Sequence, residues 1–255
     1  MKPLSDETQP AISVVILAYR ANIQIKDFVQ QVVTGFCDAR INDYELVLVA
    51  NYDVNSRDND PTPEIIRRMA NEEKRIISVT LPKRGMMGWD LQQGLQVTKG
   101  KAIAIIDGDG QMPPMDLVRL FRVMNSGEFQ FVKTYRIERG DGKFRLVMSQ
   151  VFNGLFRLLF PACHYKDINS KPKLILRSAL EQMNLTCDGW FIDGEIILEA
   201  MRLDLLFAEI PTKFKKNEWR GSFVNVGSIF EMFASMMMCR IKMWFRDNNK
   251  PNFGT

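Results

Sequence analysis

The chain has 255 residues, of which 46% are hydrophobic and 25% are charged, and this composition excludes a disordered, a collagen-like and a coiled-coil protein. Its 34 basic and 30 acidic side chains leave a formal charge of +4, which is too small to indicate a nucleic-acid-binding protein. Four scattered cysteines and a single histidine, His164, argue against a disulfide framework and a zinc site, so carboxylates are left to carry the chemistry.

The first half of the chain alternates strand-like and helix-like stretches. Residues 1–10 form a polar tail without the apolar run of a secretory signal, so we expect a cytoplasmic protein. The alternation of strand-like and helix-like stretches, with strands rich in Val and Ile, predicts a mostly parallel sheet covered by helices on both faces. In chain order the expected pairs are Ile12–Ala18 with Ile25–Phe36, Leu46–Ala50 with Pro63–Glu73, Ile76–Leu81 with Gly88–Val97, and Ala102–Ile106 with Pro114–Asn125.

The second half is less regular, and its two most apolar helical stretches are interrupted by charges. We therefore expect no transmembrane helix. The last helix, from about Phe223, mixes aromatic and methionine side chains with Arg240 and Lys242, so it either lies on an anionic membrane surface or packs on the core. The expected elements are strand Phe129–Thr134, helix Lys143–Phe160, strand Lys173–Leu176, helices near Arg177–Met183 and Phe191–Leu203, and two strands around Leu206–Ile210 and Thr212–Lys216.

The segment Asp107-Gly-Asp-Gly-Gln111 directly follows an apolar strand. Residues two apart in an extended chain point the same way, so Asp107 and Asp109 can face one site at the carboxyl end of the sheet. Together with the amide oxygen of Gln111 they form an oxygen-only ligand set that suits Mg²⁺ or Mn²⁺ and leaves room for phosphate oxygens. An acidic turn in solvent is the alternative.

A basic cluster lies between the strand ending near Thr134 and the following helix, and it contains Arg136, Arg139, Lys143 and Arg145. On that helix Arg145, Ser149 and Asn153 are spaced i, i+4, i+8, a polar stripe on an otherwise apolar rod. Guanidinium groups suit phosphate, so the pattern indicates a lipid-phosphate ligand. A solvated loop followed by a buried helix would have the same composition.

Several segments together resemble the family 2 glycosyltransferases, and most closely their polyprenyl-phosphate, dolichyl-phosphate mannose synthase-like branch. The resemblance covers roughly residues 12–223. It is carried by Ser13–Tyr19, Glu45–Val49 with Asn51 and Asp53, Arg84–Gly88 with Gly94, Asp107–Pro114, Asp188–Glu195 and Arg220–Ser222.

The resemblance implies a single GT-A-type domain over residues 11–222, with a nucleotide-binding half (11–111) and an acceptor half (112–222), followed by an amphipathic helix and tail (223–255). The donor would be a UDP- or GDP-linked sugar, and the acceptor a dolichyl or undecaprenyl phosphate on the cytoplasmic face of a membrane. The implied donor-binding residues are Ala18, Tyr19, Arg20, Asn51, Asp53, Arg84, Asp107, Gly108 and Asp109; the implied acceptor-phosphate residues are Arg136, Arg145, Ser149 and Arg220. A divalent cation, Mg²⁺ or Mn²⁺, would be held by Asp107, Asp109 and Gln111.

The expected reaction inverts the anomeric carbon, with Asp193, Arg136 and Arg145 as the catalytic residues. A phosphate acceptor is already ionised near pH 7 and needs no strong base. A saccharide hydroxyl acceptor, as in polysaccharide or lipopolysaccharide synthesis, would need one, and Asp193 is the candidate; Asp193 could instead orient Arg145 or cap a helix. A non-catalytic binding protein on the same fold is the third alternative.

Overall fold

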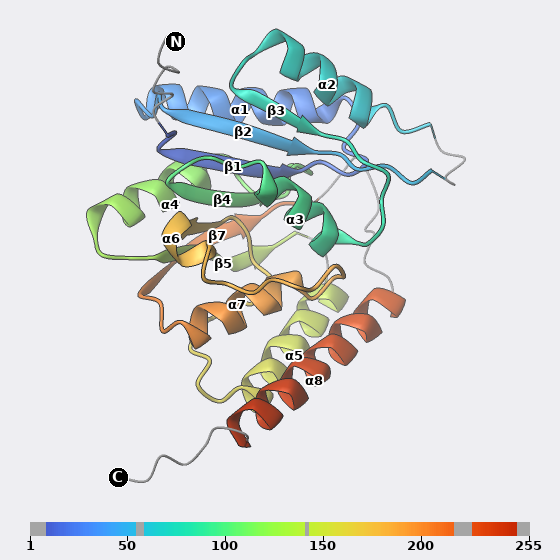
Figure 1. The fold of residues 1–255 in the computed structure, drawn as a ribbon, viewed down its shortest axis with the longest axis vertical. Coiled ribbons are helices and arrows are strands. Elements are labelled where there is room, and N and C mark those ends of the chain that lie inside the picture. The colour runs from blue at the N-terminus through green and yellow to red at the C-terminus, as the bar shows by residue number, and fades with distance from the viewer. Residues whose placement is uncertain (1–8, 55–58, 141–142, 217–225, 249–255) are drawn as a thin grey trace, which may run out of the picture.

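The structure, a computed structural model, describes residues 9–54, 59–140, 143–216 and 226–248. Within these residues one seven-stranded sheet has the order β3-β2-β1-β4-β6-β5-β7 (Figure 1). The strands are β1 (Ile12–Leu17), β2 (Tyr44–Val49), β3 (Ile76–Val79), β4 (Ala102–Asp107), β5 (Phe131–Arg139), β6 (Lys173–Leu176) and β7 (Phe207–Phe214).

Strands β1 to β4 are parallel, as the alternating pattern predicts, and β5 is parallel to β7. Strand β6 is the exception, because it runs antiparallel to both of its neighbours, β4 and β5. Its first residue, Lys173, therefore pairs with Ile105 near the end of β4. The segment that precedes β6 therefore lies at the edge of the sheet where β1 and β4 end.

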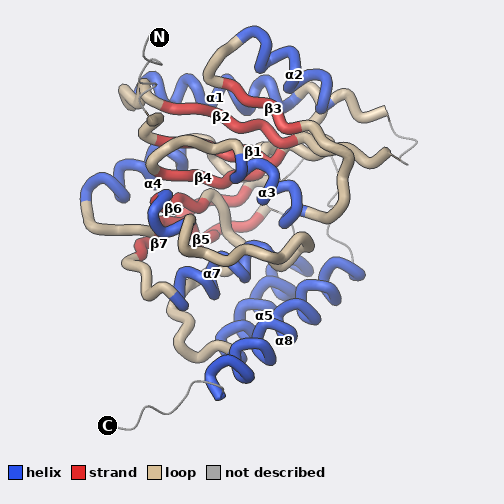
Figure 2. Tube along the Cα trace, in the orientation of Figure 1, coloured by secondary structure: helices blue, strands red, loops and turns tan. Residues whose placement is uncertain are grey.

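Helices cover both faces of the sheet (Figure 2). One core contains side chains of α1 (Gln24–Asp38), α2 (Thr62–Glu72) and α4 (Met115–Ser126). The other contains side chains of α3 (Met87–Gln96), α5 (Lys143–Leu159), α6 (Arg177–Leu180), α7 (Ile192–Arg202) and α8 (Val226–Asn248). Neighbours along β1 divide between the two cores, Val14 in the first and Val15 in the second, which explains the continuous apolar sequence of this strand.

Two expectations for the second half were wrong. A single strand, β7, replaces the two strands predicted on either side of Pro211. Proline is tolerated there because β7 is an edge strand, where a missing N–H costs no ladder hydrogen bond. Strand β5 continues to Arg139, so Arg136 belongs to a strand and not to the loop after it.

Helix α8 lies beside α5 at one end of the molecule (Figures 1 and 2). Its Met236 is fully buried and its Phe233 ring lies 5.9 Å from that of Phe152. Phe230 and Met238, in contrast, are 75% and 57% exposed. The helix therefore packs one side on the core and exposes an apolar side. None of the helices within the described residues is both long and apolar enough to span a bilayer.

Candidate functional site

The acidic motif lies at the carboxyl edge of the sheet, beside the end of β1. Leu17 at the end of β1 pairs with Asp107 at the end of β4, and the amide of Gly108 donates to the Leu17 carbonyl at 2.9 Å. The amide of Gln111 donates to Asp109 Oδ1 at 3.1 Å, which closes the turn. Gly110 has a φ of 72°, a left-handed conformation that favours glycine. This turn holds the acidic motif at the end of β4.

The oxygen atoms of this motif fit a divalent cation that would also be bound by phosphate oxygens of a ligand. The Gln111 side-chain nitrogen donates to the Lys215 carbonyl at 3.1 Å, which leaves the amide oxygen as the available ligand atom. Among the described residues no cluster of three or more His, Cys, Asp or Glu side chains is arranged to hold a metal. Asp107, Asp109 and Gln111 supply oxygen atoms only, and a hard cation bound by so few protein ligands completes its shell with water and phosphate oxygens.

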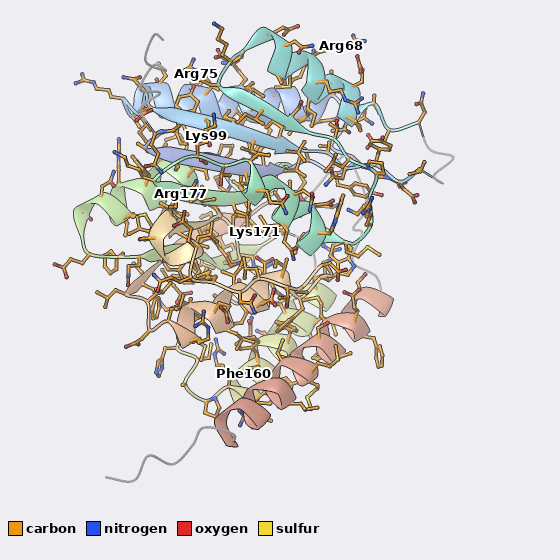
Figure 3. The ribbon with its side chains drawn as sticks, in the orientation of Figure 1. Arg68, Arg75, Lys99, Phe160, Lys171 and Arg177 are labelled. Carbon is orange, nitrogen blue, oxygen red and sulfur yellow. The ribbon has the colours of Figure 1, made fainter. Side chains whose placement is uncertain are left out.

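A network of buried charges lies next to this motif. Lys171 Nζ is 3.2 Å from Asp107 Oδ1 and 3.0 Å from Asp193 Oδ2, and Lys173 Nζ is 2.5 Å from Asp193 Oδ1. The side chains of both lysines and of Asp193 are at most 3% exposed. Lys171 is labelled in Figure 3. The network links the motif after β4 to the first turn of α7.

The pKa values in the network follow from burial and from neighbouring charge. Burial disfavours the ionised form of Asp193, but Lys171 and Lys173 outweigh it and lower the pKa of this carboxyl. Burial, partly offset by Asp193, lowers the pKa of Lys173 to about 8. Burial acts in the same direction on Lys171, but Asp107 and Asp193 outweigh it and raise its pKa. Asp193 is thus held as a carboxylate between two cations.

A pocket of about 320 Å³ opens beyond the ends of β1 and β2. Three of the predicted donor-binding residues, Tyr19, Arg20 and Asp53, line it. Arg20 has a φ of 51°, an uncommon backbone conformation for a residue other than glycine. Lys83 Nζ lies 4.1 Å from the centre of the Tyr19 ring, a cation–π contact. Burial raises the pKa of Tyr19.

Asn51 and Arg84, which were also predicted to bind the donor, do not line this pocket. Asn51 is fully buried: its Nδ2 donates to Asp90 at 2.9 Å and its Oδ1 accepts from the Leu81 amide at 2.8 Å. Asp90 also pairs with Lys83. Asn51 thus supports the Lys83 side chain that faces Tyr19.

The glycine-rich link packs against the later acidic segment, as their placement at one site requires. Gly88 donates its amide to the Gly189 carbonyl at 2.9 Å, and Met86 donates to the Asp188 carbonyl at 2.8 Å. A Cβ at Gly88 would lie 2.2 Å from the Cys187 carbonyl oxygen, so only glycine fits this approach.

The predicted acceptor residues lie on β5 and α5, and the loop before β6 connects them. Arg136 donates to Asp167 through two nitrogens, at 2.6 and 2.7 Å, in a nearly buried pair. Burial opposes ionisation of Asp167, but Arg136 outweighs it and holds the pKa of this carboxyl well below its usual range. Asn153 donates to Ser149 at 3.5 Å and accepts from the Ile168 amide at 3.1 Å. The polar stripe on α5 is thereby tied to the loop that carries Asp167 and Lys171.

Some predicted residues fall outside these contacts. Arg220 lies outside the described residues, and for Arg139 and Lys143 only the backbone is described. Arg145 is half-buried on α5.

Three buried lysines beside the site, Lys133, Lys171 and Lys173, were not predicted from the sequence as site residues. Lys171 and Lys173 precede and begin β6, and Lys133 of β5 donates to the Asp167 carbonyl at 2.5 Å and to Glu209 at 3.1 Å. A charged residue within an apolar strand, as in Phe131-Val-Lys-Thr and Lys173-Leu-Ile-Leu, was the available signal, because a buried lysine requires a partner.

The family model described as glycosyl transferase family 2 matches residues 13–185. The chain belongs to glycosyl transferase family 2. The predicted family and the mostly parallel, helix-covered fold are therefore confirmed.

Curated relatives are similar over part of their length. The undecaprenyl-phosphate 4-deoxy-4-formamido-L-arabinose transferase of Edwardsiella ictaluri is 29% identical over 147 residues, which cover 57% of this chain and 43% of the relative. The enzyme of the same description from Yersinia enterocolitica is 30% identical over 56% of this chain and 42% of its own. Glycosyltransferase AglD of Haloferax volcanii is 28% identical over 62% of this chain and 26% of its own. The chain spans less than half the length of these relatives.

Among solved structures, glucosyl-3-phosphoglycerate synthase from Mycobacterium tuberculosis superposes with a TM-score of 0.67 at 20% identity, covering 91% of this chain and 78% of that one. That structure is described as a complex with Mn²⁺, UDP and phosphoglyceric acid, and another of the same enzyme as a complex with Mg²⁺ and UDP. At this level of identity the likeness establishes the shared fold.

Proposed function

We propose that this family 2 glycosyltransferase transfers a sugar from a nucleotide diphosphate to a polyprenyl phosphate, with inversion at the anomeric carbon and with a bound Mg²⁺ or Mn²⁺. The two relatives described above as undecaprenyl-phosphate 4-deoxy-4-formamido-L-arabinose transferases support undecaprenyl phosphate as the acceptor. In the reaction an acceptor phosphate oxygen attacks the anomeric carbon, and the bond from that carbon to the diphosphate breaks in line. The nucleoside diphosphate leaves.

The observation that carries the proposal is the state of Asp193. A hydroxyl acceptor needs a base with a pKa near the working pH. Asp193 is instead buried between Lys171 and Lys173, which lower its pKa and occupy its oxygens. A phosphate acceptor arrives ionised and needs no such base. We therefore assign Asp193 to positioning the network and not to proton transfer.

Two groups of residues would bind the nucleotide sugar and its cation. Tyr19, Arg20 and Asp53 would hold the nucleoside in their pocket. Asp107, Asp109 and Gln111 would hold the cation, which when bound neutralises charge that develops on the leaving diphosphate.

The acceptor phosphate would bind between β5 and α5. Arg136 is oriented by its two hydrogen bonds to Asp167, and Arg145 and Ser149 lie on one face of α5. Arg220 stays a prediction for the same phosphate.

The lipid tail would lie along the apolar surface of α5 and α8 at the membrane. Exposed apolar side chains recur on α8 at Phe230, Met237, Met238 and Ile241, and on α5 at Leu146, Val147, Val151 and Leu158. A helix with such an exposed apolar stripe is suited to lie in a membrane interface.

The test is transfer of label into lipid. The purified protein, with Mg²⁺ or Mn²⁺ and short polyprenyl phosphate in detergent, is incubated with labelled UDP- and GDP-sugars, and label is counted in the organic phase. We expect metal-dependent label that Asp109→Ala abolishes and that Asp38→Ala, a change of an exposed aspartate at the end of α1, leaves intact. Hydrolysis of the donor without label in lipid would refute the phosphate acceptor, and no turnover with any donor would refute the transferase.

A further inference from the structure

Lys171 binds the first carboxylate of the acidic motif within the protein itself. Its Nζ lies 3.2 Å from Asp107 Oδ1 and 3.3 Å from Asp107 Oδ2, so one ammonium contacts both oxygens. Asp107 is reached from solvent on its other side, because its side chain is 26% exposed whereas that of Lys171 is 3% exposed. Lys171 thus contacts the carboxylate from the protein interior, and an incoming ligand would reach it from the solvent side.

The ammonium is held in this place. Lys171 also contacts Asp193 Oδ2 at 3.0 Å and Met87 Sδ, at the start of α3, at 3.3 Å. Asp193 is in turn fixed by Lys173, whose Nζ donates to the Ser170 carbonyl at 2.9 Å. Withdrawing Lys171 from Asp107 would leave a buried cation with one carboxylate fewer, which is costly in an apolar interior.

A cation that approaches Asp107 therefore meets a carboxylate whose charge is already neutralised. An opposite charge within a few ångströms is strongly felt in a buried site, where solvent screens it little. In the free protein, Asp109 and Gln111 are then the remaining ligands of the motif, too few for a hard cation without further oxygen atoms. The diphosphate of the donor can supply those atoms.

We infer that Lys171 is a built-in counter-ion of Asp107 that keeps the free protein's affinity for a divalent cation low, so that the cation binds together with the donor diphosphate. This inference rests on the proposed function, because it takes Asp107, Asp109 and Gln111 as the metal motif. Lys171 acts through Asp107 and is a positioning residue. It also sets an order of binding, in which a metal-bound donor enters a site that does not hold the metal alone.

The experiment measures Mn²⁺ binding and needs no turnover. Free Mn²⁺ is titrated by its electron paramagnetic resonance signal against the wild-type protein, Lys171→Met and Lys173→Met, each with and without UDP. Lys173→Met is the matched control, because it removes a second buried ammonium from Asp193 and leaves Lys171 on Asp107.

We expect weak Mn²⁺ binding by the free wild-type protein and much tighter binding with UDP. Lys171→Met should bind Mn²⁺ without UDP at least about tenfold more tightly, since one charge within 4–6 Å shifts a carboxylate equilibrium by that order. Lys173→Met should stay closer to wild type. Lys171→Gln, which keeps a polar group at this position but no charge, gives the same comparison if Lys171→Met does not fold by circular dichroism.

Equal Mn²⁺ affinity of the free wild-type and Lys171 variants would overturn the inference, and so would an equal gain in Lys173→Met. Asp109→Ala in the same titration separates the two proposals. If it leaves Mn²⁺ binding unchanged, the motif is not the metal site and both the inference and the metal assignment fail. If it abolishes binding while the Lys171 variants match wild type, the inference alone fails.

Discussion

The pair of Arg136 and Asp167 gives the sharpest test of how the acceptor side is built. The two side chains are 8% and 10% exposed and share two short hydrogen bonds. Asp167→Asn keeps the shape of the side chain but removes its charge, and it leaves the Asp167 carbonyl that accepts from Lys133 in place. The variant removes the negative charge that Arg136 faces in this nearly buried pair.

Removing one partner of a buried ion pair costs about 3–5 kcal/mol of unfolding free energy. For a chain of this size 1 kcal/mol corresponds to roughly 2–4 °C, so we expect the melting temperature at pH 7.5 to fall by roughly 6–20 °C. Glu73→Gln is the matched control, because Glu73 makes the same kind of pair with Arg75 on the surface, where both side chains are about half exposed. A surface pair contributes little, and its loss should shift the melting temperature far less.

The pH dependence has a defined sign. Because Arg136 depresses the pKa of Asp167 in the folded protein, the pair contributes stability that is fully present above the unfolded pKa of about 4 and is lost as pH falls through the folded pKa. The gap between wild type and Asp167→Asn should therefore stay constant from pH 7.5 down to about 5, and it should shrink as the pH of the thermal denaturation is lowered below about 4. A gap that does not change with pH, or a loss no larger than that of Glu73→Gln, would refute this account.

Two further predictions concern the donor link and the membrane surface. Gly88→Ala should lower both the melting temperature and the affinity for UDP measured by calorimetry, because its Cβ would lie 2.2 Å from a backbone carbonyl oxygen. Gly154→Ala is the control and should be neutral or slightly stabilising, because its Cβ would meet no atom within 4 Å. Equal behaviour of the two variants would contradict the close packing at Gly88. Phe230→Ser combined with Met238→Ser should reduce co-sedimentation with anionic vesicles, whereas serine at the similarly exposed Leu206 should not, and unchanged binding would argue against α8 as the membrane contact.

The parallel half of the sheet could be predicted because strands β1, β2 and β4 are buried on both faces. Such strands read as continuous apolar runs, and the helices between them show their own period. The acidic motif was equally predictable, since a strand that ends in Asp107 must present it at the carboxyl edge. The position of the acidic motif directly after an apolar strand was enough to place it at the carboxyl edge of the sheet.

The lysines could not be placed in the same way, because their location depends on a reversal of strand direction. Strand β6 is inserted antiparallel between β4 and β5, which brings Lys171 to the end of β4 although 64 residues separate it from Asp107. A strand of only four residues has no periodic pattern from which its direction in the sheet could be predicted. The partners of Asp193 therefore required the three-dimensional structure.

The ion-paired network beside the site has no net charge among its own members, and this decides where the charges of the proposed substrates would be met. Within the part of the chain that the structure describes, this network contains four cations and four carboxylates. Its ion pairs join Lys133 to Glu209, Arg136 to Asp167, Lys171 to Asp107 and Asp193, and Lys173 to Asp193. A balanced network fixes geometry but offers an incoming anion little net attraction. The proposed substrates, a nucleotide diphosphate and a lipid phosphate, would together bring several negative charges to one edge of the sheet. Their compensation would therefore fall mainly to the cation proposed at Asp107, Asp109 and Gln111 and to the arginines of the pocket and of α5, while Arg136, held by Asp167, would orient the acceptor phosphate. Metal dependence and acceptor binding should then be lost by separate substitutions.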